Sequence, residues 1–220
     1  MTIWENGCVL LWMNLMVNIV KKPWGYEYLL FENGKVAIWH LLISAYGQTS
    51  LHSHPNKKTG LIVLDGAAKV SFLGNDSKLF YGEKIMIRHG VFHRTQSMTP
   101  YLLQLLEIET PVNKEDIIRL DDAYGRAGST DMGDIGIAID PIDINSGRVG
   151  KCSISYRKLT SDSFQDDNSF DNFMITNGSV SHIGSEVAGP GDIISYNNLK
   201  TLVNKFELSS DIEGLAIKAC

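Results

Sequence analysis

Short runs of strand-forming residues, separated by glycine-containing turns, constrain the fold of this chain more than any other feature. Asn33-Gly34, Asp65-Gly66 and Gly74-Asn75 are turn signals between these runs. Asp65-Gly66 separates two apolar runs by only two residues, which predicts a tight hairpin. The runs are Gly25–Phe31, Lys35–Ser44, Leu61–Leu64, Ala67–Leu73, Lys84–Ile87 and Tyr101–Glu109. Many short strands with regular turns predict an all-β sandwich or barrel.

The second half of the chain weakly repeats the first. An apolar run ending in a hairpin turn occurs at Ile62–Gly66 and again at Met174–Gly178. A glycine, an acidic residue and an apolar run follow at Gly82–Ile87 and again at Gly191–Ser195. The repeat predicts a duplicated β-module. We therefore divide the chain into an apolar N-terminal segment (1–20), a first domain (21–127), a glycine-rich linker (128–150) and a smaller, degenerate second module (151–220).

Two further segments carry local predictions. Val112–Asp122 mixes charged residues with Ile117, Ile118 and Leu120 and is the best helical candidate of the first half. Val9–Val20 is strongly apolar but too short to span a bilayer as a helix, and it lacks the charge and cleavage pattern of a signal peptide. Because such a segment promotes aggregation when exposed, we expect it to be buried at a homodimer interface through strand addition.

Charge and cysteine content limit the partners and the cellular compartment that we expect for this protein. The 220 residues include 25 acidic and 20 basic side chains, a net charge of −5, so a broad cationic face for nucleic acid is not expected. Cys8, Cys152 and Cys220 lie far apart and are odd in number, which favours reduced thiols in a cytoplasmic protein. Neither nucleic acid nor a membrane is expected as a partner.

Three histidines form the candidate metal site. His52 and His54 are two residues apart, so on a strand both imidazoles point to the same face. His93 follows the next hairpin, and a barrel would bring its strand across from the first. Three neutral imidazoles on one interior face suit a divalent transition metal. Zinc, manganese, iron and nickel all remain open.

The spacing of these residues resembles a known family. Gly47-x4-His52-x-His54 with Gly66, followed by Gly82-x7-Gly90-x2-His93, resembles the two motifs of the cupin superfamily. Lys22–Glu27 and Asp116–Arg126 resemble the flanks of the mannose-6-phosphate isomerase domain of bacterial sugar-nucleotide enzymes. The resemblance implies a cupin-type jelly roll over about residues 21–127, a bound divalent metal and a sugar-phosphate substrate. With the degenerate second module, the expected architecture is bicupin-like.

The sequence also departs from that family. The family's metal-binding Glu should fall near position 59, where this chain has Lys57, Lys58 and Thr59. A neutral hydroxyl cannot replace the charge of a carboxylate, so we expect weaker metal binding than at a site of three His and one Glu. The second module has His182 as its only histidine and cannot hold the same metal.

Four more residues are candidates for catalysis or substrate binding. Glu107 lies on an apolar strand, where an inward carboxylate must be paired or metal-bound, and it is the candidate base or replacement ligand. An exposed position at the strand end is the alternative. Arg126 either binds a sugar phosphate as a bidentate donor or pairs with neighbouring aspartates. Lys57 and Lys58 are either phosphate partners at the barrel mouth or solvated loop residues.

These features lead to one main functional hypothesis and two alternatives. The main one is a metal-dependent enzyme acting on a sugar phosphate or related carbohydrate, isomerase-like, with the metal as a Lewis acid and a base that moves a proton between adjacent carbons. The missing Glu supports a non-catalytic carbohydrate-binding or regulatory cupin instead. A metal-dependent oxygenase is the third hypothesis, because three His also serve Fe(II).

Overall fold

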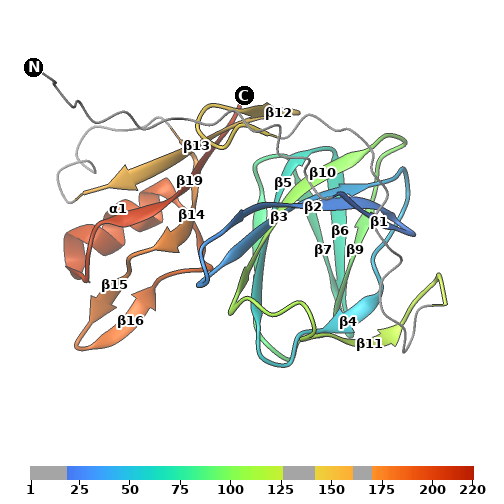
Figure 1. Cartoon of the computed structure of the whole chain (residues 1–220), viewed down its shortest axis with the longest axis horizontal. Helices are drawn as coiled ribbons and strands as arrows, with labels where there is room; N and C mark the ends of the chain where they lie inside the picture. The colour runs from blue at the N-terminus through green and yellow to red at the C-terminus, as the bar shows by residue number, and fades with distance from the viewer. Residues whose placement is uncertain (1–18, 126–141, 161–169) are drawn as a thin grey trace, which may run out of the picture.

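A computed structural model describes residues 19–125, 142–160 and 170–220 of the chain. Its strands form two β-modules that pack against each other (Figure 1). The apolar segment up to Asn18, the greater part of the glycine-rich linker and Arg126 lie outside the described residues. Within the described residues, none of the helices is long and apolar enough to cross a membrane.

The first module consists of two antiparallel sheets that enclose an apolar core. The six-stranded central sheet has the order β1 (Ile19–Lys22), β2 (Gly25–Glu32), β3 (Ala37–Ile43), β10 (Leu103–Thr110), β5 (Lys58–Asp65), β8 (Lys84–Ile87). The five-stranded outer sheet has the order β11 (Ile118–Asp121), β4 (Leu51–Ser53), β9 (His93–Ser97), β6 (Ala67–Phe72), β7 (Asp76–Phe80). Trp39, Leu61, Leu105 and Val70 fill the space between the sheets. The predicted jelly-roll barrel is confirmed.

The central sheet is buried on both faces. Every residue of β3 is buried, and six of the eight residues of β5 are buried. Alternate residues of β5 and β10, such as Ile62 and Leu106, point away from the barrel and pack against Met174 and Leu215 of the second module. This second contact explains why the strands of the central sheet are continuously apolar instead of alternating.

The second module repeats the strand order of the first. Its five-stranded sheet has the order β12 (Arg148–Val149), β13 (Cys152–Leu159), β19 (Ile212–Ala219), β14 (Asn172–Asn177), β17 (Ile193–Ser195), and its small sheet the order β16 (Ser185–Ala188), β15 (Val180–His182), β18 (Glu207–Leu208). Taken in the order in which they lie in the sheets, the strands of the five-stranded sheet correspond to β2, β3, β10, β5 and β8 of the first module. Those of the small sheet correspond to β7, β6 and β9. The predicted second β-module is therefore confirmed.

Backbone hydrogen bonds place the two copies in register. Gly82 N donates to Val63 O and Val63 N donates to Glu83 O; in the second module Gly191 N donates to Ile175 O and Ile175 N donates to Asp192 O. The hairpin glycines of both copies have positive φ, 90° at Gly66 and 75° at Gly178. A side chain there would be strained, so the turn signal repeats for a physical reason.

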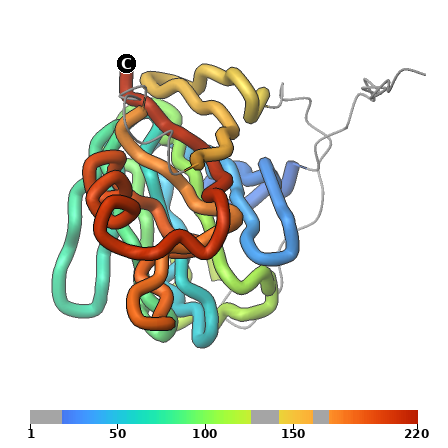
Figure 2. Tube along the Cα trace, turned by 90° about the vertical axis from the view of Figure 1, so that its left-hand side faces the viewer, coloured from blue at the N-terminus to red at the C-terminus, as the bar shows by residue number. Residues whose placement is uncertain are grey.

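The interior of the second module is closed by apolar side chains. Helix α1 (Tyr196–Lys205) is inserted between β17 and β18 and buries Leu199 and Tyr196 against Phe170 and Phe173. Figure 2 shows this module from its own side, with its red and orange segments in front of the blue and green strands of the first. Within the described part of the second module no three His, Cys, Asp or Glu residues cluster as metal ligands would.

The predicted helix over Val112–Asp122 is wrong. This segment forms turns and then the short strand β11, which pairs with β4. Ile118 and Leu120 are 55% and 58% exposed, whereas Ile117 and Arg119 line a cavity of the barrel. That alternation has the period of a strand, and pairing with β4 outweighs the local helix preference.

Candidate metal centre

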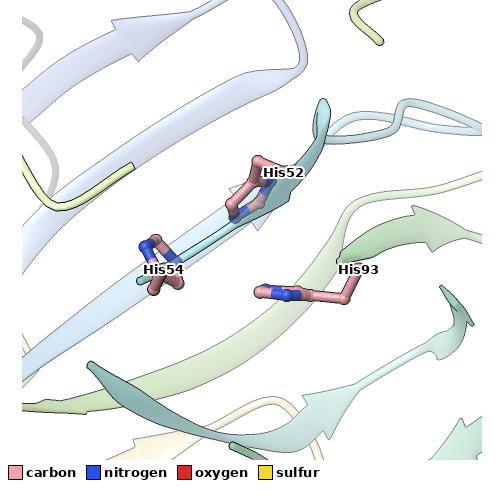
Figure 3. A group of neighbouring side chains, drawn as sticks. All are labelled: His52, His54 and His93. Atoms are coloured by element: carbon pink, nitrogen blue, oxygen red, sulfur yellow. The ribbon is translucent and has the colours of Figure 1, made fainter. Parts of the chain in front are cut away.

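The three histidines lie together at one end of the barrel. His52 is on β4, His54 follows directly after β4, and His93 begins β9 opposite His52. Their ring centroids are 4.4 to 5.5 Å apart. One nitrogen of each ring lies within 4.8 Å of the others. Figure 3 shows the three side chains pointing into the same space.

Backbone carbonyls fix the tautomer of each ring. Nδ1 of His52 lies 2.8 Å from the carbonyl oxygen of Ser50, and Nδ1 of His54 lies 2.6 Å from that of Asp116. Nδ1 of His93 lies 3.1 Å from the carbonyl oxygen of Val91. A carbonyl oxygen only accepts, so each Nδ1 must carry the proton. Each Nε2 therefore keeps a lone pair, as a metal ligand requires.

The rings are held in the neutral form. Burial lowers the pKa of His52 well below its ordinary value, and the neighbouring His93 and His54 lower it further. Burial lowers the pKa of His54 to about 4, and it also lowers that of His93. Nε2 of His54 is buried and accepts no hydrogen bond within the described part of the chain. These nitrogens thus fit a divalent metal, which binds the neutral imidazole.

A cavity of about 130 Å³ opens beside the histidines. Its lining is dominated by charged and aromatic side chains, among them Lys22, Trp24, Glu27, Trp39, Lys57, Glu107, Glu109, Lys114 and Arg119. These side chains come from both sheets and from the segment before β11. The cavity therefore joins the histidine cluster to a set of ionisable groups deep inside the barrel.

Two ion pairs and one isolated carboxyl group occupy the cavity wall. Lys57 Nζ lies 2.5 Å from Glu109 Oε2, and both side chains are at least 96% buried. Lys22 Nζ lies 3.2 Å from Glu27 Oε1. Burial and the neighbouring Glu109 raise the pKa of Glu107 to about 8, and Lys57 only partly opposes this rise. Glu107 thus titrates near neutral pH.

Thr59 is the residue that the family resemblance predicts in place of the metal-binding carboxylate. Its side chain is 1% exposed, and its Oγ1 has no hydrogen-bond partner among the described residues. Thr59 is the register partner of Glu109 on β10. Glu109 is already paired with Lys57, whose positive charge lowers the pKa of His54 and His93. The residues therefore fit a three-nitrogen site that lacks the compensating carboxylate.

One protein-family model matches the first module. The model of the family described as mannose-6-phosphate isomerase C-terminal matches residues 14–122. The match spans just under half of the chain and falls mostly on the first module, the cupin-type barrel that holds the histidine cluster.

The relatives with curated names are larger proteins. Mannose-1-phosphate guanylyltransferase of Sinorhizobium fredii is 27% identical over 103 residues, which cover 46% of this chain and 20% of that protein. The alginate biosynthesis protein AlgA of Pseudomonas putida is 25% identical over 112 residues, covering 50% of this chain and 23% of that protein. The chain spans about a fifth of the length of these relatives. Among solved structures, KdgF from Halomonas sp. is 14% identical with a TM-score of 0.43, covering 47% of this chain and 95% of that one.

The other predicted site residues lie in different places. Glu107 and Lys57 line the cavity. Lys58 does not: its Nζ lies 2.8 Å from Asp192 Oδ1 of the second module. Arg126 is outside the described residues, and its role stays a prediction, as do the roles of the histidines.

Sequence reasoning missed most of the cavity wall. Lys22, Trp24 and Glu27 belong to the flank that resembles the family, but the sequence analysis assigns none of them a role in the site. Lys114 and Arg119 were hidden by the helical interpretation of their segment. The sequence Ile117-Ile118-Arg119-Leu120 has no apolar–polar alternation, so it carries no signal that would have revealed them.

Proposed function

We propose that this domain binds a divalent transition metal through Nε2 of His52, His54 and His93 and isomerises a phosphorylated sugar. The observation that carries the proposal is the cavity, which is lined by His52, His54 and a carboxyl group, that of Glu107, with a pKa of about 8. His93 lies against the two lining imidazoles, and all three rings have a fixed tautomer. The match of residues 14–122 to the mannose-6-phosphate isomerase C-terminal family supports the substrate class.

The charge of the cavity supports an anionic substrate. Four cationic side chains, Lys22, Lys57, Lys114 and Arg119, face three carboxyl groups, those of Glu27, Glu107 and Glu109. With Glu107 protonated the lining carries a surplus of two positive charges, which matches a phosphate dianion. Lys114 Nζ lies 3.7 Å from the centre of the Trp39 ring, which holds one cation at this wall. We assign Lys114 and Arg119 to the phosphate group.

Glu107 is the proposed acid–base group. When bound, the metal supplies Lewis-acid polarisation of a sugar oxygen. With a pKa of about 8, Glu107 accepts or donates a proton at physiological pH with little energetic cost. In an aldose–ketose isomerisation it would move a proton between adjacent carbons, while the carboxylates of Glu109 and Glu27 stay in their ion pairs with Lys57 and Lys22.

The test is an isomerase assay on the chain after chelation and reloading with single metals. We expect interconversion of mannose 6-phosphate and fructose 6-phosphate with at least one of zinc, manganese, iron and nickel. His93→Ala should abolish metal binding and turnover, and Glu107→Gln should abolish turnover while metal is retained. Glu32→Gln, an exposed carboxylate outside the cavity, is the matched control. A Glu107→Gln variant with wild-type turnover would refute the assignment.

A non-catalytic carbohydrate-binding cupin is the second candidate. The observation that favours it is the pair of changes at the metal site, Thr59 in place of a carboxylate and a buried ammonium of Lys57 beside the imidazoles. This candidate predicts that sugar phosphates bind in calorimetry but are not converted under any metal. Binding that survives His93→Ala would favour it over the isomerase.

A further inference from the structure

The residue that orients His54 is not itself a member of the histidine cluster. Asp116 lies on the segment before β11 and is 7% exposed. Its main-chain oxygen accepts the hydrogen bond from Nδ1 of His54 at 2.6 Å. Its carboxylate accepts three more from the turn that follows His54. Asp116 therefore contacts the histidine segment through both its backbone and its side chain.

The three side-chain bonds divide between the two carboxylate oxygens. Oδ2 accepts the backbone N–H groups of Asn56 and Lys57, each at 2.9 Å. Oδ1 accepts Nδ2 of Asn56 at 2.7 Å. Because the acceptor is a carboxylate, each of these bonds is stronger than a bond between neutral groups. Together they hold the backbone of residue 116, and hence its carbonyl, at a fixed place beside His54.

We infer that Asp116 is a positioning residue that sets the tautomer and orientation of His54 and couples the metal site to the cation-bearing wall of the cavity. The same segment carries Lys114, Ile117 and Arg119, which line the cavity. Movement of Asp116 would therefore displace a metal ligand and the substrate-binding wall together. The role in metal binding rests on the proposed function, whereas the role in orienting His54 does not.

The test exchanges the two partners of one hydrogen bond. Asp116→Asn leaves Oδ1 of the new amide to accept the two backbone N–H groups, but its NH₂ group then faces the NH₂ group of Asn56. Two donors in contact repel, so the single variant should lose the alignment. The double variant Asn56→Asp/Asp116→Asn restores donor and acceptor with the same total charge. Asp121 lies on β11 and forms an ion pair with Arg94, and Asp121→Asn, which removes the charge of Asp121, is the matched control.

Two readouts on metal-free and cobalt-loaded protein decide the outcome. We expect Asp116→Asn to weaken Co²⁺ binding by about 10- to 100-fold, as outer partners of metal ligands do, and to change the visible cobalt spectrum. Nitrogen-15 NMR of the metal-free protein should show the His54 Nδ1–H tautomer lost in this variant. Both properties should return toward wild type in the double variant and stay unchanged in Asp121→Asn.

Failure of the role of Asp116 and failure of the proposed function give different results in this experiment. If the single variant keeps the His54 tautomer and the cobalt affinity of the wild type, or if the double variant is no better than the single one, the role of Asp116 is refuted. If the wild type takes up no cobalt, the proposed function fails, and the His54 tautomer in the same samples still decides whether Asp116 positions the ring. An unfolded single variant with a folded double variant of native tautomer supports the inference.

Discussion

Replacing Lys57 by methionine should change stability and metal affinity in opposite directions. Lys57 and Glu109 are 3% and 4% exposed, so the side chain that is left without its partner stays buried. In the Lys57→Met variant the carboxylate of Glu109 keeps, among the described residues, the hydrogen bond from Trp39 Nε1–H at 3.3 Å. The loss of the positive charge beside His54 and His93 should strengthen binding of a divalent cation at the same time.

The magnitude follows from the geometry of the pair. At 2.5 Å, and with an effective dielectric constant of about 20, the attraction is about 7 kcal/mol before desolvation is counted. Breaking a buried pair by removing one partner typically costs about 3–5 kcal/mol, because the unpaired charge stays buried. We expect a loss in this range for Lys57→Met at pH 7. The double variant Lys57→Met/Glu109→Gln, which removes both charges, should be close to the wild type.

The neighbouring residue provides the control. Lys58 also forms an ion pair, with Asp192 at 2.8 Å, but these side chains are 31% and 23% exposed. Solvent screening limits such a pair to about 1 kcal/mol or less, so Lys58→Met should be nearly neutral. Urea unfolding followed by circular dichroism measures all four proteins, and cobalt titration measures the affinity. Equal losses for the two single lysine variants, or weaker cobalt binding in Lys57→Met, would refute the reasoning.

Three further predictions concern other sites. Thr59→Glu should raise Co²⁺ affinity about tenfold, equivalent to ~1.4 kcal/mol, by supplying the missing carboxylate; an unchanged titration would contradict this. Burial lowers the pKa of His40 from 6.5 to about 4, so its neutral form contributes stability above pH 6.5 that is lost as the pH falls to about 4. The loss is about 3 kcal/mol, and His40→Gln should flatten this part of the pH–stability curve measured by urea unfolding. Leu199→Ala in α1 should cost about 2–5 kcal/mol in the same assay while cobalt binding stays intact, because Leu199 fills the second module.

Local sequence patterns are enough to predict the turns and strands of this protein and the histidine cluster. Turn glycines with positive φ, such as Gly66 and Gly178, occur where only glycine is unstrained, so they mark the hairpins of both modules. Alternation along a strand places His52 and His54 on one face, and the glycine spacing to His93 is enough to predict a cluster. The duplication was visible for the same reason, since equivalent turns need equivalent residues.

Contacts between residues far apart in the sequence determine which charged side chains meet inside the barrel. The partner of Lys57 is Glu109, 52 positions away, and their contact depends on the register between β10 and β5. The sequence does not reveal the role of Asp116. Its four hydrogen bonds to residues 54–57 join segments that are far apart in the sequence, and no local pattern predicts them. The sequence does not predict the short helix α1. Burial against both sheets of the second module stabilises this helix more than its own sequence does. Local periodicity specifies strands and turns, whereas long-range register specifies the chemistry of the cavity.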